Sequence, residues 1–161
     1  MALLLDITAT AGFTGLMAMA AVEDFRRLVI PNAVVLGLCA LWPLQLAAAP
    51  SLTLANTLGA AGCAAVIFLV GAMLFWRGLI GGGDVKLLAA ASLWAGPGMI
   101  PALLLTTAVL GGLLTLVLLS VPALRVVCGS AAGTALRSLP VPYGVAIAAA
   151  AVIVMVQPKF S

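Results

Sequence analysis

The sequence predicts an all-α integral membrane protein with about six transmembrane helices. Of its 161 residues, 65% are hydrophobic and only 7% are charged, and the mean hydropathy is +1.35. Soluble domains usually carry about 25% charged residues. A spanning helix needs roughly 20 apolar residues, so the chain has room for about six spans and for no separate soluble domain. We therefore expect a single membrane-embedded domain over residues 1–161.

Six apolar segments follow one another along the chain. Their bounds are 3–22, 30–49, 52–75, 84–94, 99–120 and 141–156. No positively charged leader precedes the first segment, so we expect a retained helix and not a signal peptide. The fourth segment would rise only about 16 Å, so it crosses a membrane only if it continues through the AGPG turn or if its neighbours thin the barrier. Within residues 121–140 a helical apolar stripe runs from Leu124 to Leu139, and we expect an interfacial helix there.

The positions of the cations predict how the chain is oriented. Six of the seven Lys and Arg residues lie in the first, third and fifth gaps between segments: Arg26, Arg27, Arg77, Lys86, Arg125 and Arg137. By the positive-inside rule these gaps are cytoplasmic, which puts both termini on the non-cytoplasmic side. Because the cations are scattered between apolar runs, we expect a lipid bilayer as the surrounding and no nucleic-acid partner. The oligomeric state stays open.

Acidic residues are rarer still, and two of the four share one predicted location. Asp6 and Glu23 have ordinary explanations, but the topology puts Asp24 and Asp84 at the same depth on the cytoplasmic side, sixty residues apart in sequence. Repulsion between two close carboxylates keeps one of them protonated while the other acts as a base. Such a pair can activate water and protonate a leaving amide nitrogen. Either aspartate could instead pair with a nearby cation or cap a helix.

The histidine and cysteine content argues against a metal site. The chain has no histidine and its three cysteines form no CxxC pair, so we expect neither a Cys/His zinc site nor any other metal or cofactor. Gly81, Gly82 and Gly83 precede Asp84 and are expected to allow unusual backbone angles and the close approach of an extended peptide. Two other classes stay open: a proton-coupled transporter, because intramembrane acids often mark ion paths, and a non-catalytic membrane scaffold subunit with small-residue helix packing.

Three motifs carry a resemblance to a known family. GGGDVKLLAA, residues 81–90, resembles the GxGDxKL form that type IV prepilin peptidases show among GxGD membrane aspartyl proteases. DFRRLVIPN, residues 24–32, is similar to that family's first-aspartate motif, and VPYGVAIA, residues 141–148, to its PYG-containing last helix. The motifs occur in the family's order and cover nearly the full chain. Leu28 and Val29 depart from the pattern, since members often carry further basic residues there.

The resemblance implies an intramembrane aspartyl endopeptidase whose catalytic pair is Asp24 and Asp84. The other motif residues that carry over are Gly81, Gly83, Lys86, Pro31, Asn32, Pro142, Tyr143 and Gly144. The implied substrates are prepilins or pseudopilins, whose basic leader is removed at the cytoplasmic face of the bacterial inner membrane. The chain resembles the short form associated with tight-adherence (Flp-type) pili, so a peptidase without the N-methylating domain is expected.

Overall fold

The structure, a computed structural model, describes residues 1–48, 53–121 and 141–156, and all its elements there are helices. They are α1 (Ala2–Arg27), α2 (Asn32–Ala48), α3 (Leu54–Trp76), α4 (Gly82–Ser120) and α6 (Tyr143–Val156). Helices α1, α3 and α4 are long and apolar enough to cross a membrane, whereas α2 and α6 are apolar but shorter. This all-helical architecture fits a membrane protein. The stripe from Leu124 to Leu139, where an interfacial helix is expected, lies outside the described residues.

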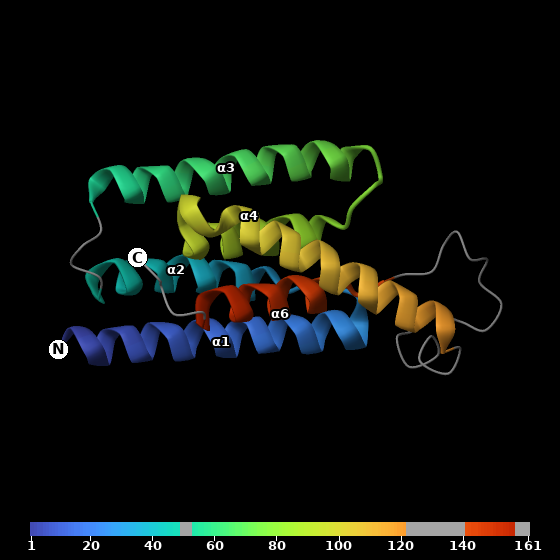
Figure 1. The fold of residues 1–161 in the computed structure, drawn as a ribbon, viewed down its shortest axis with the longest axis horizontal. Coiled ribbons are helices and arrows are strands. Elements are labelled where there is room, and N and C mark those ends of the chain that lie inside the picture. The colour runs from blue at the N-terminus through green and yellow to red at the C-terminus, as the bar shows by residue number, and fades with distance from the viewer. Residues whose placement is uncertain (49–52, 122–140, 157–161) are drawn as a thin grey trace.

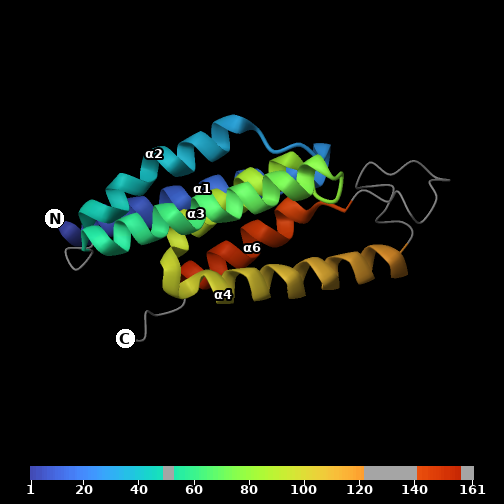
Figure 2. The ribbon, with the colours of Figure 1, turned by 90° about the horizontal axis from the view of Figure 1, so that it is seen from above.

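Helix α4 contains the fourth and fifth apolar segments, joined by a sharp break at Gly96. This glycine has φ 69° and ψ 170°, a conformation that L side chains rarely adopt. Pro97 follows it, and a proline disfavours the helical region for the residue before it. Figures 1 and 2 show α4 doubling back at this point. Its first arm (82–95) and second arm (97–120) therefore run in opposite directions. The first arm begins at Gly82, two residues before the fourth apolar segment predicted from the sequence.

The helices run back and forth, so that every second connection lies at the same end of the bundle. Helices α1 and α3 and the second arm of α4 end on the right in Figure 1, where α2, the first arm and α6 begin. All four Lys and Arg side chains of the described residues belong to these helix ends: Arg26, Arg27, Arg77 and Lys86. We call this the basic end. It is the end that the positive-inside argument predicts to be cytoplasmic.

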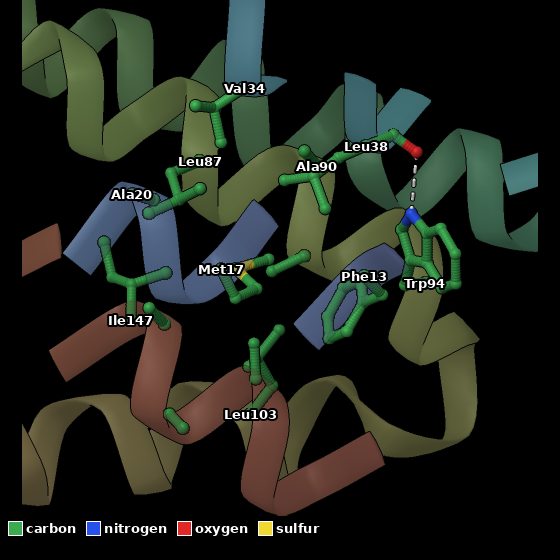
Figure 3. Close-up of a cluster of buried hydrophobic side chains, with 14 of the residues drawn as sticks. Phe13, Met17, Ala20, Val34, Leu38, Leu87, Ala90, Trp94, Leu103 and Ile147 are labelled. Atoms are coloured by element: carbon green, nitrogen blue, oxygen red, sulfur yellow. Dashed lines mark hydrogen bonds between the residues drawn. The ribbon is translucent and has the colours of Figure 1, made fainter. Parts of the chain in front are cut away.

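A single apolar core unites α1, α2, α4 and α6 (Figure 3). Phe13 and Met17 of α1 are fully buried in it. The ring of Phe13 lies 4.6 Å from that of Trp94 in α4, tilted by 38°. The indole Nε1 of Trp94 donates a hydrogen bond of 2.9 Å to the backbone carbonyl of Leu38 in α2. A buried indole N–H needs such a partner, so this bond fixes the first arm against α2.

Helix α3 stands apart from this core. None of its residues belongs to the core cluster, and Ala60 is its one buried residue. It packs mainly against α4, where Gly71 lets Val85 approach so closely that a Cβ at position 71 would lie 2.7 Å from Val85 Cγ1. Most of the surface of α3 therefore faces the surroundings, which in a bilayer are lipid.

Candidate active site

Asp24 lies on the buried stripe of α1. Phe13, Met17, Ala20 and Asp24 follow at intervals of four, three and four residues, which puts them on one face of the helix. The first three are fully buried and Asp24 is only 5% exposed. The helix ends one turn later, where the N–H of Leu28 donates a hydrogen bond of 2.9 Å to the backbone oxygen of Asp24. The core-facing stripe therefore ends in a carboxyl group at the basic end.

The first turn of α6 covers this carboxyl group. A Cβ on Gly144 would lie 2.8 Å from both Cγ and Oδ2 of Asp24, closer than real side chains pack, so only glycine fits there. The backbone N–H groups of Gly144 and Val145 interact with the Asp24 carboxyl group. Its Oδ2 atom is buried and has no hydrogen-bond partner among the described residues. The start of a helix, with its free N–H groups, favours a negative charge at this position.

Asp84 lies in the first turn of α4, three residues after the N-cap Gly81. The expectation of unusual backbone angles in this glycine run is wrong. Gly81 has φ −69° and ψ 138°, ordinary extended values, and Gly82 and Gly83 are the first two helical residues. The glycines instead permit close approach: a Cβ on Gly81 would lie 2.8 Å from Oδ2 of Asp84.

Asp24 and Asp84 line the same cavity, which has a volume of about 930 Å³, and are near enough to interact electrostatically. The alternative that they serve as ion-pair partners finds no support. In the described part of the chain the one ion pair joins Arg27 Nε to Glu23 Oε2 at 3.4 Å, and Asp6 is exposed. The two aspartates that were expected at one depth thus line one cavity, and neither is neutralised by a cation in the described residues.

Ile30 lies between the start of α4, which carries Asp84, and the start of α6, which covers Asp24. Its side chain is buried, with Cβ 3.2 Å from where a Cβ of Gly83 would be and Cδ1 2.8 Å from where one of Gly144 would be. It therefore sits between the starts of α4 and α6, in contact with both glycine backbones. A close-packed side chain of this kind sets the spacing between α4, which carries Asp84, and α6, which covers Asp24.

The other motif residues surround the same region. Lys86 Nζ donates a hydrogen bond of 3.1 Å to Oδ1 of Asn32, which joins the first arm of α4 to the start of α2, directly after Pro31. Pro142 is buried, and Tyr143 lines the cavity. The Tyr143 ring lies against the second arm, where a Cβ on Gly111 would lie 2.7 Å from Cε1 of the ring.

Comparison with known proteins decides the family. The sequence model of the type IV leader peptidase family matches residues 11–116, about two thirds of the chain. The chain belongs to this family. The match includes the motifs around Asp24 and Asp84, whereas the PYG motif lies beyond it. Neither a curated protein nor a solved structure matches the chain. Membership in a leader peptidase family implies a peptidase and makes prepilin-like leaders the relevant substrates.

Two residues that line the candidate site were missed by sequence reasoning. Ile30 stands inside the quoted first-aspartate motif, but an apolar residue beside apolar residues gives no signal. Thr107 of the second arm lines the cavity, and its Oγ1 is buried with no hydrogen-bond partner among the described residues. It lies in a segment whose sequence shows only an apolar helix, so only the doubling back of α4 reveals its position.

Proposed function

We propose that this protein is an aspartyl endopeptidase that removes the leader of type IV prepilins or pseudopilins, with Asp24 and Asp84 as its catalytic pair. The observation that carries the proposal is the shared cavity, which is lined by two carboxyl groups that have no cation partner among the described residues. Unpaired acids at membrane depth are costly and usually functional. Family membership favours a peptidase over a transporter or a scaffold subunit.

The surroundings of the two carboxyl groups suggest different roles. Asp24 is covered by the start of α6, where free helix N–H groups favour a negative charge, so we assign it the role of the base. Asp84 lines the same cavity as Asp24, and because two close carboxyl groups do not both ionise readily, we assign Asp84 the role of the acid. In the proposed reaction Asp24 takes a proton from water, the water oxygen bonds to the scissile carbonyl carbon, and Asp84 protonates the carbonyl oxygen. The tetrahedral intermediate then loses its C–N bond as Asp24 returns the proton to the amide nitrogen and one of the two hydroxyl groups of the intermediate returns its proton to Asp84, giving one carboxylic acid and one amine.

The setting of this reaction is also part of the proposal. The catalytic pair lies at the basic end, and by the positive-inside rule that end faces the cytoplasm of a bacterial inner membrane. Prepilin leaders are basic and reach the membrane from that side. The resemblance to the short form of the family favours substrates of tight-adherence (Flp-type) pili as the specific class.

Co-expression with a prepilin tests the proposal. Asp24→Asn and Asp84→Asn should each abolish leader removal, seen as a prepilin that keeps its larger size on a gel, while the variant protein remains in the membrane fraction. Asp6→Asn and Glu23→Gln are matched controls, because Asp6 is exposed and Glu23 pairs with Arg27 outside the cavity. Normal processing by either cavity variant removes that aspartate from the mechanism.

A further inference from the structure

A second cavity lies at the end of the bundle opposite the basic end, where α2 and α6 end, α3 begins and α4 breaks (Figure 1). It has a volume of about 310 Å³, and no described residue lines both this cavity and the cavity of the two aspartates. Small-molecule sites have volumes of about 300–1,000 Å³. We call this space the far-end cavity, and catalysis at the other end of the bundle does not account for it.

Gln45 of α2 is the buried amide of the far-end cavity. Its side chain is 8% exposed, and its Oε1 atom is buried with no hydrogen-bond partner among the described residues. Native structures nearly always supply a partner to a buried polar atom. Trp94 in the same lining shows this, because its Nε1 donates to the carbonyl of Leu38. The unpaired oxygen of Gln45 therefore indicates a bound molecule that donates a hydrogen bond.

The lining is uncharged and becomes more apolar with depth. Its amide and hydroxyl side chains are Gln45, Asn56 and Thr57, and none of its described residues is acidic or basic. Trp42 lies one turn further from the end of α2 than Gln45, and Ala60 lies one turn further into α3 than Thr57. A lipid has the same order, with its polar headgroup at the membrane surface and its chain deeper in the bilayer.

We propose that the far-end cavity binds the uncharged, hydroxyl-bearing headgroup of a membrane lipid. A hydroxyl group both donates and accepts hydrogen bonds, and so do the amide groups of Gln45 and Asn56. An ammonium or phosphate group would be buried here without an opposite charge in the described lining, which is costly. Water alone fits less well, because a buried water makes about three hydrogen bonds and most of this lining is apolar. Pro97 and Gly98 line the cavity and are exposed, so it is open to the surroundings.

A lipid in this place would join α3 to the rest of the bundle. Helix α3 contributes no residue to the apolar core, and Ala60, its one buried residue, lines the far-end cavity. A headgroup there would contact α2, α3 and the break in α4 at once. Because a molecule that binds only the native state raises the unfolding temperature, binding is measurable as a shift in Tm.

Thermal unfolding of the full-length protein tests the binding. The protein is kept in lauryldimethylamine oxide, and octyl glucoside or octylphosphocholine is added at equal mole fraction. Octyl glucoside, whose sugar headgroup is uncharged and bears hydroxyls, should raise Tm by at least about 3 °C, as expected for a ligand several-fold above its Kd. Octylphosphocholine has the same chain and no hydrogen-bond donor, so it should not raise Tm. Free glucose should not raise it either, because it lacks the chain that a lipid site binds.

Two variants with matched controls tie the shift to the cavity. Gln45→Met removes the amide at similar volume, and Ala60→Met fills the space, so both should abolish the octyl glucoside shift. Thr8→Val and Ala61→Met change exposed residues outside the cavity and should keep it. If Ala60→Met does not fold, Gln45→Met decides alone. No shift in the parent, an equal shift with octylphosphocholine or with glucose, or a shift that persists in Gln45→Met overturns the proposal. These measurements do not use cleavage, so their outcome is independent of the proposed function.

Photolabelling locates the bound headgroup directly. An octyl glucoside that carries a diazirine next to the sugar is irradiated with the full-length protein in phosphatidylcholine vesicles, and the labelled residues are found by mass spectrometry. Labels should concentrate at the end of α2 and the start of α3. Gln45→Met should lower this labelling at least about fivefold, the effect of one net hydrogen bond, and Thr8→Val should leave it unchanged. Labels spread evenly along α1 and α3, or equal labelling of the two variants, would contradict a site at Gln45.

Discussion

Glycine at two positions is required by the space beside each aspartate, not by backbone conformation. Gly81 and Gly144 have no positive φ, yet a Cβ at either would lie 2.8 Å from a carboxyl oxygen of Asp84 or Asp24, respectively. This distinction could not be made from the glycine-rich sequence, which predicts freedom of the backbone. Because space and not backbone conformation is limiting, even alanine at these two positions should lower activity.

Gly81→Ala should therefore lower the cleavage rate about a hundredfold, because its methyl group displaces the Asp84 carboxyl group and misplacement of a catalytic group by about 1 Å has effects of this size. Gly82→Ala is the control. Its Cβ would meet the Phe75 ring at 3.2 Å, and that ring is 54% exposed and free to move. Rates at matched protein levels in membranes give the comparison. Equal rates in the two variants would show that Gly81 does not set the Asp84 position.

Gly144→Ala should lower both stability and activity. The added methyl group meets Asp24 and Cδ1 of Ile30 at 2.8 Å, and both neighbours are buried. Overpacking of this kind costs about 1–3 kcal/mol. Gly112→Ala is the control, because a Cβ there meets nothing within 4 Å. Thermal unfolding in detergent and prepilin cleavage are measured for both variants, and an unchanged Gly144→Ala protein would contradict the close contact of α6 with Asp24.

At the scale of the helices, the break in α4 decides what the site contains. The AGPG sequence predicted a turn between two segments, and the structure has that turn at Gly96. The sequence could not predict beside which helices the second arm returns, since this depends on packing against α6 and α3. That return puts Thr107 and Ala108 into the cavity that holds the aspartates.

The Lys86–Asn32 hydrogen bond couples α4 to α2, so its two ends should act as a unit. Lys86→Met and Asn32→Leu should each lower the cleavage rate by about two- to tenfold, the range of one net hydrogen bond. The double variant should fall no further than either single variant, because the bond is already lost. Rates of the four proteins measure the coupling. Losses that multiply in the double variant would mean that the two residues act separately.

At the scale of the whole molecule, the alternation of cations along the chain predicted which helix ends lie together. The described helices run back and forth as that argument requires, and their four Lys and Arg residues share one end. The six apolar segments correspond to α1, α2, α3, the two arms of α4 and α6. Periodicity and charge are local properties of the sequence, so they predict where the helices lie in the chain and which helix ends are on the same side of the bundle. The position of Ile30 between two glycine backbones depends on three helices at once and is not encoded locally.

The side of the membrane that the basic end faces is still a prediction. In a background without Cys39, Cys63 and Cys128, single cysteines are introduced by Gly98→Cys, at the break in α4, and by Leu79→Cys, at the basic end. Both positions are exposed. An impermeant thiol reagent added to intact cells should label position 98 and spare position 79. The reverse pattern would put the aspartates on the outer side and contradict a cytoplasmic site.

The central claim is that Asp24 and Asp84 act together on one water molecule and one peptide bond. The most direct test is the cleavage rate of a prepilin by four purified proteins: the parent, Asp24→Asn, Asp84→Asn and the double variant. Residues that act as a unit have strongly non-additive effects. We predict that each single variant loses at least about a thousandfold in rate and that the double variant loses no more than that. A single variant with a rate near that of the parent, or losses that multiply in the double variant, would contradict the account.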